Sequence, residues 1–372
     1  MEFFLDLAWD IESVNNDNIN QHLEDWAGRE FGESIAEDVA NLMNEYYRLS
    51  FLRKPEFMGW SSVEPKTEVS ISQFNSKAND NELLRRISLY QDLLDKVTQL
   101  KNNVDEDRLD AWFQLVEYPV KGATLMNHKF LYAQLANETN KKVSQKKFTE
   151  LSKNAYEQIQ QLTKFYNEEM NSGKWKHIMD MSPRKLKVFD MPKIGKPKNI
   201  KIKTPVIDNK NKQLIFIQAN DYSDNKGSGN YKWKAIKGLG YSNNSITLSP
   251  FKNAYFSKDE QPYIEYAFFA FEAGLFELNI KTLPTHSNNL DHQIGVQIDE
   301  NEIQYFNTNT KGRSKEWKQN VLRNSQIVKL QSVIKEKGKH SIKLYVNQTG
   351  IVIDQLSIDF AMDKPFYEIP YN

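Results

Sequence analysis

The hydrophobic period of this chain changes once, near residue 190, and no other feature constrains its fold so strongly. Before that point, apolar residues recur at helical spacing in four segments, 33–52, 79–100, 105–137 and 148–170. After it, short segments alternate or run apolar over strand lengths, between turns rich in glycine and asparagine. A helix-forming half is therefore followed by a strand-forming half.

The four periodic segments of the first half are joined by short polar turns, a pattern that predicts an antiparallel helical bundle. Asp80 and Asn81 are placed to cap the second helix. Pro119 is expected to end or kink the third, because proline lacks a backbone donor and clashes with the preceding turn.

The second half contains one helix-like segment, at 315–323, and is otherwise typical of an antiparallel β-sandwich. The strongest strand candidates are 213–219, 262–271, 275–283, 293–299, 340–346 and 351–358. Between the halves, 191–210 holds prolines among lysines and asparagines and buries too little apolar surface to fold alone. The expected division is a helical domain at 1–190, a linker at 191–210 and a sandwich at 211–372.

Composition excludes several classes of function. The chain has 372 residues, enough for two cores, and its 49 basic residues balance 49 acidic ones. Because this balance gives the chain no net positive charge that would attract polyanions, we expect neither a nucleic-acid partner nor a membrane partner. The absence of cysteine excludes disulfides and thiolate metal sites. The first residues carry Glu2 and Asp6 and do not resemble a signal peptide.

Acidic residues are abundant, but abundance does not assign a catalytic pair. Two carboxyl groups that cleave a glycoside must face each other across a cleft. Glu33, Glu37 and Asp38 are instead typical of a solvated helix face. The six histidines are scattered without metal-ligand spacing. The sequence therefore assigns no catalytic residue, and we expect no zinc or other metal and no cofactor.

Several short motifs occur in a fixed order and together resemble the C-terminal half of glycoside hydrolase family 115, the xylan α-1,2-glucuronidases. Trp233 and Trp317 accompany the later motifs. In chain order these are LDLAWD at 5–10, FG at 31–32, RKPE at 53–56, DAWFQLVEYPV at 110–120, GKWKHIMD at 173–180, GLG at 238–240, LPT at 283–285 and VLRN at 321–324. The resemblance covers nearly the whole chain.

The resemblance implies that the catalytic carboxylates lie in a (β/α)8-like barrel before the first residue of this chain. Residues 3–8 would then form the last strand of that missing barrel. Trp9 and Asp10 would stand at the rim of the substrate pocket, where residues at strand ends point into the active site. In the alternative interpretation, Trp9 packs a domain junction and Asp10 caps a turn.

Tyr231 and Trp233 are the candidates for carbohydrate binding, since they alternate with lysines and share one face of a predicted strand. An open face could stack on a sugar, whereas a closed face would place both rings in the core. The segment 217–222 is similar to the opening of carbohydrate-binding jelly rolls, in which an acidic residue helps to hold calcium. Here that position is Asn220, which leaves Asp221 and Asp224 as oxygen donors.

These observations lead to one function hypothesis and two alternatives. The chain would be the non-catalytic C-terminal region of an extracellular or periplasmic α-glucuronidase that acts on xylan or glucuronoxylan. It would support the barrel, associate as a homodimer and carry a carbohydrate-binding surface in a module-like sandwich. The alternatives are a stand-alone carbohydrate-binding or assembly protein, and a self-contained enzyme with a cleft that the sequence does not display.

Overall fold

The computed structural model describes residues 2–15, 17–55, 58, 74, 76, 81–195, 212–285 and 291–362. The chain forms two compact units. One comprises Met1–Thr67 and Asp80–Lys201, and the other comprises Glu68–Asn79 and Ile202–Asn372. We call the first the helical unit and the second the sandwich unit. The division near Lys201 falls within the predicted linker, most of which, from 196 onwards, lies outside the described residues.

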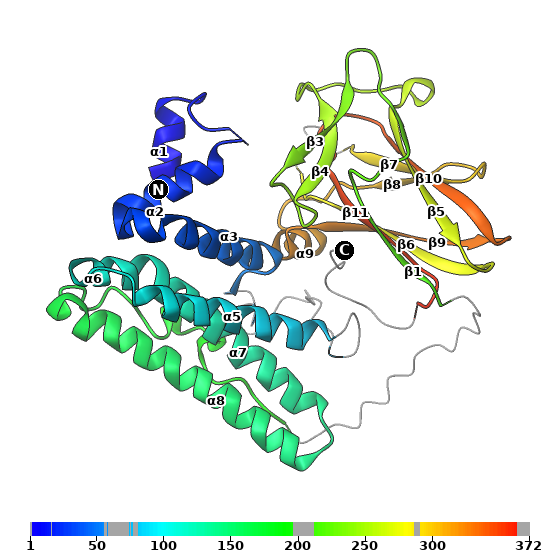
Figure 1. The fold of residues 1–372 in the computed structure, drawn as a ribbon. Coiled ribbons are helices and arrows are strands. Elements are labelled where there is room, and N and C mark those ends of the chain that lie inside the picture. Colours follow the sequence, from blue (N-terminus) through cyan, green and yellow to red (C-terminus); the bar gives the residue numbers. More distant parts are fainter. Residues whose placement is uncertain are drawn as a thin grey trace. The chain divides into compact units, whose positions relative to one another are not determined.

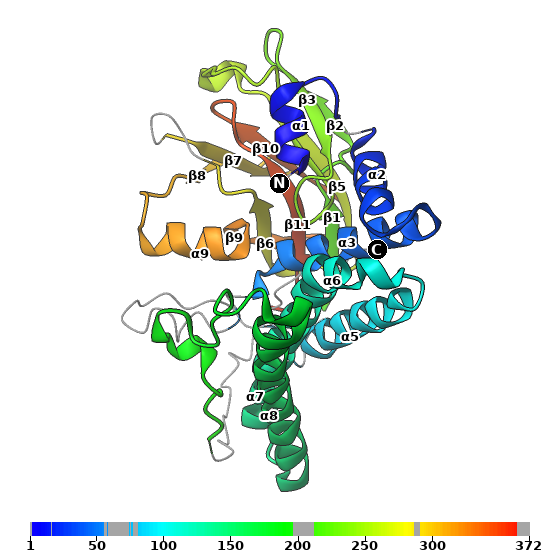
Figure 2. The ribbon, with the colours of Figure 1, turned by 90° about the vertical axis from the view of Figure 1, so that its left-hand side faces the viewer.

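The helical unit is an antiparallel assembly, as predicted. Its longest helices, α7 and α8, pack along each other, and α5 packs against α7 (Figures 1 and 2). The α-helices are α1 (Glu2–Trp9), α2 (Ile19–Phe31), α3 (Ala36–Leu52), α5 (Glu82–Lys101), α6 (Leu109–Trp112), α7 (Tyr118–Glu138) and α8 (Lys142–Lys164). No helix in the described part of the chain combines the length and the apolar character that crossing a membrane requires.

The first element differs from expectation, because the predicted barrel strand at 3–8 is wrong and helix α1 occupies this segment. A strand must pair its backbone groups with a neighbouring strand, and no strand lies among the described residues before Leu214. A helix pairs these groups within the segment itself. Asp6 of α1 contacts His22 of α2 at 2.8 Å, and Glu2 of α1 forms an ion pair with Arg29 of α2.

Two predicted helix signals are confirmed. The Asn81 side chain accepts a hydrogen bond from the backbone of Leu84 at 3.1 Å and caps α5, while Asp80 lies outside the described residues. Helix α7 begins at Tyr118, which places Pro119 in its first turn. The residues before it, Phe113–Glu117, form a π-helix, η4, and a second π-helix, η5, covers Phe165–Glu169.

The segment after α8 is held against the bundle by a buried cation. The Lys129 ammonium donates to the carbonyls of Val188 at 2.9 Å and Asp190 at 3.3 Å. Burial lowers the pKa of Lys129 to about 8, against the opposing effect of the Asp190 carboxylate. Asn137 of α7 accepts from the Gly195 backbone at 2.9 Å. The first residues of the predicted linker are therefore packed on the helical unit.

The sandwich unit has two antiparallel sheets, as predicted (Figure 1). One sheet has the order β3-β4-β11-β6-β9, with β1 also paired to β11, and the other has the order β2-β5-β10-β7-β8. The strands are β1 (Leu214–Gln218), β2 (Asp224–Lys226), β3 (Lys232–Lys237), β4 (Asn244–Ser249), β5 (Tyr263–Ala270), β6 (Gly274–Thr282), β7 (Gln293–Ile298), β8 (Gln304–Asn307), β9 (Gln326–Ile334), β10 (Gly338–Val346) and β11 (Ile353–Asp359).

Alternate residues of both sheets form one apolar core. Its fully buried members include Ile264, Tyr266, Phe276, Leu278, Ile280, Ile294, Val296, Leu344, Leu356 and Ile358. Helix α9 (Lys315–Arg323) matches the predicted segment, and the Ser314 side chain caps it by accepting from the Trp317 backbone at 3.1 Å.

A buried carboxylate fixes the connection between β3 and β4. Asp354 of β11 accepts from the backbone of Tyr241 at 2.8 Å and of Ser242 at 3.0 Å. It also accepts from the hydroxyls of Ser242 at 2.7 Å and Ser245 at 2.9 Å. The GLG motif leads into this site, and Gly240 has a left-handed backbone with φ of 81°. The motif is therefore explained by a backbone-binding carboxylate.

Candidate functional site

Trp9 and Asp10 lie at the end of α1 on the surface of the helical unit. Trp9 is 94% exposed. The Asp10 carboxylate accepts from the Glu12 backbone at 3.0 Å, so it stabilises a local turn. With the strand replaced by a helix, these residues stand at no barrel rim within the described structure.

A group with metal-ligand geometry occurs beside them, although histidine spacing gave no sign of it. Glu2, Asp6 and His22 bring one ligand atom each within 4.8 Å of one another. Each of the three already has a partner: Asp6 and His22 bond to each other, and Glu2 pairs with Arg29. Exposed groups of this kind occur commonly without an ion. The arrangement is a contact between α1 and α2.

Tyr231 and Trp233 both contact the sandwich core. Trp233 is 9% exposed, and its indole nitrogen donates to the Lys226 carbonyl at 3.2 Å. The Tyr231 ring is partly buried and packs edge-on against Phe256, with 5.6 Å between ring centroids. Stacking on a sugar needs an open ring face, so this burial favours the core interpretation of the pair.

The expected oxygen donors for calcium do not converge. Asp221 and Asp224 are exposed, and Asp224 lies on β2, where it accepts from the Tyr263 hydroxyl at 3.0 Å. Asn220 is exposed as well. Among the described residues these side chains do not form a group with metal-ligand geometry.

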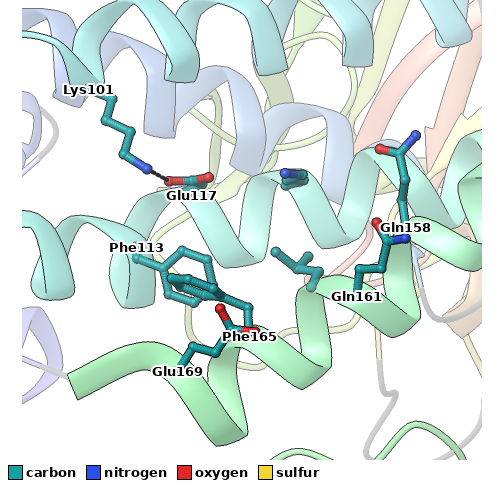
Figure 3. Close-up of a pocket in the computed structure, with 9 residues that line it drawn as sticks. Lys101, Phe113, Glu117, Gln158, Gln161, Phe165 and Glu169 are labelled. Carbon is teal, nitrogen blue, oxygen red and sulfur yellow. Dashed lines mark hydrogen bonds and ion pairs between the residues drawn. The ribbon is translucent and has the colours of Figure 1, made fainter. Parts of the chain in front are cut away.

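One pocket of about 440 Å³ lies in the helical unit (Figure 3). At its upper edge the Lys101 ammonium contacts the Glu117 carboxylate at 2.8 Å. The Phe113 and Phe165 rings lie together below, with centroids 4.8 Å apart. The lining is completed by Lys121, Gln158, Gln161, Leu162 and Glu169.

Both π-helices open onto this pocket. Phe113 and Glu117 are the first and last residues of η4, and Phe165 and Glu169 are those of η5. A π-helix places side chains out of ordinary helical register, and such segments are frequent at functional sites. Sequence periodicity missed the pocket, because a one-residue insertion in a helix barely disturbs the apolar pattern. The aromatic residues after Asp110 were the only available signal.

The chemistry of the pocket is that of a binding surface with two acids. The Phe165 ring, which is 40% exposed, can stack on a ligand, while two amides and two lysines can hydrogen-bond to it and attract it. Glu117 is engaged by Lys101, whereas Glu169 is exposed. None of the nine lining residues is a histidine, serine or threonine. A glycosidase mechanism would have to use Glu117 and Glu169, which makes them the residues to test.

The RKPE motif begins at the end of α3, where its first residue takes part in a buried hydrogen-bond network. Arg53 is buried at the end of α3, where its carbonyl accepts from the Arg86 guanidinium at 2.8 Å. Arg86 also donates to the side-chain oxygen of Asn127 at 2.7 Å. Glu56, the last residue of the RKPE motif, lies outside the described residues.

Similarity to known proteins covers both units. A model described as the glycosyl hydrolase family 115 C-terminal domain matches residues 210–370, and one described as glycosyl hydrolase family 115 matches residues 1–57. The solved structure of a family 115 4-O-methyl-α-glucuronidase with specificity for decorated arabinogalactans aligns at 32% identity and a TM-score of 0.77. The alignment covers 96% of this chain, and the chain spans 43% of that relative's length.

More distant solved structures cover a smaller share of the chain. A family 35 carbohydrate-binding module from Clostridium thermocellum aligns with 39% of this chain and 97% of the module, at 12% identity. Its TM-score of 0.28 is too low to carry an argument. No curated protein sequence matches the chain.

Proposed function

Because the chain belongs to glycoside hydrolase family 115, we propose that it forms the non-catalytic C-terminal region of an α-glucuronidase. The observation that carries the proposal is the alignment of nearly all of this chain with less than half of a family 115 glucuronidase. The pocket of Figure 3 supports it, since one of its two acids is already engaged by a lysine.

The proposed substrate of the complete enzyme is a polysaccharide decorated with glucuronic acid or its 4-O-methyl ether. The relative with solved structure acts on decorated arabinogalactans. Glucuronoxylan is the other candidate, from the resemblance to xylan α-glucuronidases. The two share the decoration and differ in the backbone, so both belong in any assay.

Support of the barrel is proposed for the helical unit, and the exposed face of α1 favours it. Phe4, Leu5, Trp9 and Ile11 are each more than half exposed around this short helix. Apolar side chains gathered at one place mark a surface that another part of the protein covers. We infer that the barrel packs on α1 and its flanking turn.

Association into a homodimer is a further proposed role. The aromatic content of 110–132 motivates this role, although Trp112 and Phe113 are buried in the core of the unit itself and offer no surface to a second copy. Light scattering of the 372-residue chain, with Trp9→Ser as the matched variant, distinguishes the partners. A dimer that Trp9→Ser dissociates would assign the α1 face to a second copy instead of the barrel.

The activity itself tests the main proposal. The 372-residue chain and a longer form that includes a family 115 barrel would be assayed for release of glucuronic acid from glucuronoxylan and from arabinogalactan. We expect release by the longer form alone. Release by the 372-residue chain that disappears in Glu117→Gln or Glu169→Gln would overturn the proposal and favour a self-contained enzyme. Glu168→Gln, on the exposed surface of the same π-helix, is the control.

The alternative of a stand-alone carbohydrate-binding or assembly protein makes a different prediction. In that case the longer form would show no release from either polysaccharide, whereas binding by the 372-residue chain would remain. Measuring binding and release on the same preparations separates the two functions.

A further inference from the structure

Three tyrosines form a row across the outer face of the five-stranded sheet. Tyr263 of β5 pairs with Tyr345 of β10, and Tyr345 pairs with Gly295 of β7. Gly295 in turn pairs with Tyr305 of β8, so these positions share one level across four strands. Their neighbours along the strands, among them Ile264, Leu344, Val346, Ile294 and Val296, are buried in the core. Because side chains alternate along a strand, the row faces outward.

Gly295 makes the row continuous. A Cβ atom at this position would lie 2.9 Å from Cε1 of Tyr305 and 3.2 Å from Cβ of Tyr345. The Tyr305 ring therefore lies over the glycine, next to Tyr345. On the other side of Tyr345 lies Tyr263, with ring centroids 5.6 Å apart. The Tyr263 and Tyr345 rings are inclined to each other by 54°, and all three side chains are partly buried. We call the three side chains the tyrosine row.

Each hydroxyl of the tyrosine row is held by a side-chain oxygen. The Tyr263 hydroxyl donates to Asp224 at 3.0 Å. The Tyr345 hydroxyl donates to Gln297 at 2.8 Å, and that of Tyr305 donates to Gln261 at 2.9 Å. Rings fixed in this way lose little conformational entropy when a ligand binds. Such a surface is preorganised.

The charges beside the tyrosine row favour a neutral ligand. The Lys343 ammonium lies over the Tyr263 ring, 5.6 Å from its centroid, and is paired with Glu265 at 3.6 Å. Lys258 lies 5.4 Å from the centre of the Tyr305 ring, and the next two residues along the chain are acidic. At the other end of the row, Asp224 adds a negative charge and Lys226, the exposed register partner of Tyr263, adds a positive one. No excess positive charge is left to attract a carboxylate-bearing sugar.

The rest of the face is unlike a protein interface. The outward positions of β5, β10 and β7 hold Glu265, Lys343 and Gln297 beside the row and no leucine, isoleucine, valine or methionine. One aliphatic side chain, Ile303, reaches this face, where its Cγ2 would lie 2.9 Å from a Cβ at Gly295. Protein interfaces that bind tightly bury such aliphatic side chains or isolated aromatic anchors in their core. Rings in a line with amides and charges at their border suit the alternating apolar and hydroxyl surfaces of a sugar chain.

We propose that the tyrosine row binds neutral pyranose residues of a polysaccharide backbone by stacking. This inference rests on the proposed function, because that function places the chain on a decorated polysaccharide. The proposed sugar contact lies on the outer face of the five-stranded sheet instead of at Tyr231 and Trp233. The protein would recognise the polysaccharide backbone and not its glucuronic acid decoration.

Calorimetric titration of the whole 372-residue chain tests the proposal. The probes are neutral xylo-oligosaccharides, neutral galacto-oligosaccharides and the same xylo-oligosaccharides carrying glucuronic acid. We expect millimolar or tighter binding of at least one neutral probe, unchanged by 0.5 M salt because stacking is not screened, whereas attraction between exposed charges is. Decorated and undecorated xylo-oligosaccharides should bind alike.

Matched variants assign the binding to the row. Tyr345→Ala and Tyr305→Ala should each weaken it about tenfold, equivalent to about 1.4 kcal/mol, while Tyr305→Phe retains it. Phe271→Ala is the control, because this ring is 60% exposed beyond the far end of β5. Near-ultraviolet circular dichroism of each variant verifies its fold.

Four results would overturn the proposal. They are no heat with any neutral probe at millimolar concentration, binding unchanged in both alanine variants, binding lost in salt, and a dimer that the tyrosine variants dissociate. None depends on glucuronic acid release. Failure of the tyrosine row is therefore distinguishable from failure of the proposed enzyme function.

Discussion

Each unit contains buried charged side chains that bind the backbone, and two cations of the helical unit can be compared with one carboxylate of the sandwich unit, which differs from them in sign. In the helical unit, Arg86 and Lys129 donate to backbone carbonyls at the end of α3 and in the segment after α8. In the sandwich unit, Asp354 accepts from backbone N–H groups and hydroxyls before β4. Each charge fixes an irregular stretch of chain.

The difference in sign follows from which backbone group the local geometry leaves unpaired. The last turn of a helix leaves carbonyls without partners, and these need a donor. A turn that passes through left-handed glycines, such as Gly238 and Gly240, presents successive N–H groups, and these need an acceptor. Buried charges are often read as catalytic. Here their hydrogen bonds to the backbone explain them without chemistry.

The largest expected effect is in the sandwich. Asp354→Ala removes the acceptor of four hydrogen bonds and leaves buried donors unpaired, so the unfolding free energy of that unit should fall by about 4 kcal/mol. Urea titration followed by hydrogen exchange of β11 peptides measures it. Asp259→Ala, at an exposed carboxylate, is the control. A loss no larger than the control's would mean that Asp354 does not fix the turn.

The helical unit should respond to pH through Lys129. Its folded pKa of about 8 lies below the unfolded value of 10.5. Between these values the unfolded state binds more protons, so stability rises with pH. The gain approaches about 3 kcal/mol over the whole interval, at about 1.4 kcal/mol for each pKa unit.

Lys129→Met isolates this contribution from the tyrosines, several of which have pKa values that burial raises. The difference in unfolding free energy between wild type and variant, measured from pH 7.5 to 9.5, should shift in favour of the wild type as the pH rises. If the difference in unfolding free energy did not change with pH, the lowered pKa of Lys129 would be contradicted.

Two glycines of one turn offer a smaller, matched test. Gly238 and Gly240 have similar left-handed backbones, with φ of 76° and 81°. A Cβ at Gly238 meets nothing within 4 Å, whereas one at Gly240 clashes with Ser245 and Asp354. Gly238→Ala should cost about 1 kcal/mol from backbone strain, and Gly240→Ala about 2 kcal/mol more. Equal thermal unfolding midpoints of the two variants would show that the site around Asp354 accommodates the added methyl group at little energetic cost.

Much of the fold could be predicted from the sequence, because periodicity reports which face of an element is buried. The predicted helix at 315–323 matches α9, and the predicted strands at 213–219 and 293–299 match β1 and β7 within one residue at each end. Four strands were missed. The polar β2 and the short β8 are edge strands of three and four residues and show no alternation. The longer β4 and β9 were not predicted either.

The sites were harder to predict, because they depend on distant residues. The alternating sequence pattern placed Trp233 on one face of its strand, but it could not show that this face is buried in the core between the two sheets. Strand register alone brings Tyr263, Tyr345 and Tyr305 into one row. At the N-terminus, the strand predicted at 3–8 depended on neighbours that the described chain does not contain, and local hydrogen bonds formed α1 instead.

The smallest expected effect concerns the boundary between the units. Composition predicted a linker from 191, yet Asn137 contacts the backbone of Lys193 at 3.3 Å and of Gly195 at 2.9 Å, and Gln145 donates to the Gly195 carbonyl at 3.0 Å. Exposed hydrogen bonds of this kind contribute about 1 kcal/mol each at most. Asn137→Ala should therefore leave global unfolding almost unchanged while it releases this stretch.

Limited proteolysis with a lysine-specific protease would detect the release as faster cleavage after Lys193. Asn154→Ala, on α8, is the control for a lost exposed amide. In the wild type, cleavage should be slower at Lys193 than at lysines beyond 195, because a protease needs several consecutive residues in extended form and Asn137 holds two of them. Equal rates at Lys193 in the wild type and Asn137→Ala would show that the helical unit does not protect this stretch. The polar, proline-bearing segment would then act as a linker from 191, as its composition predicts.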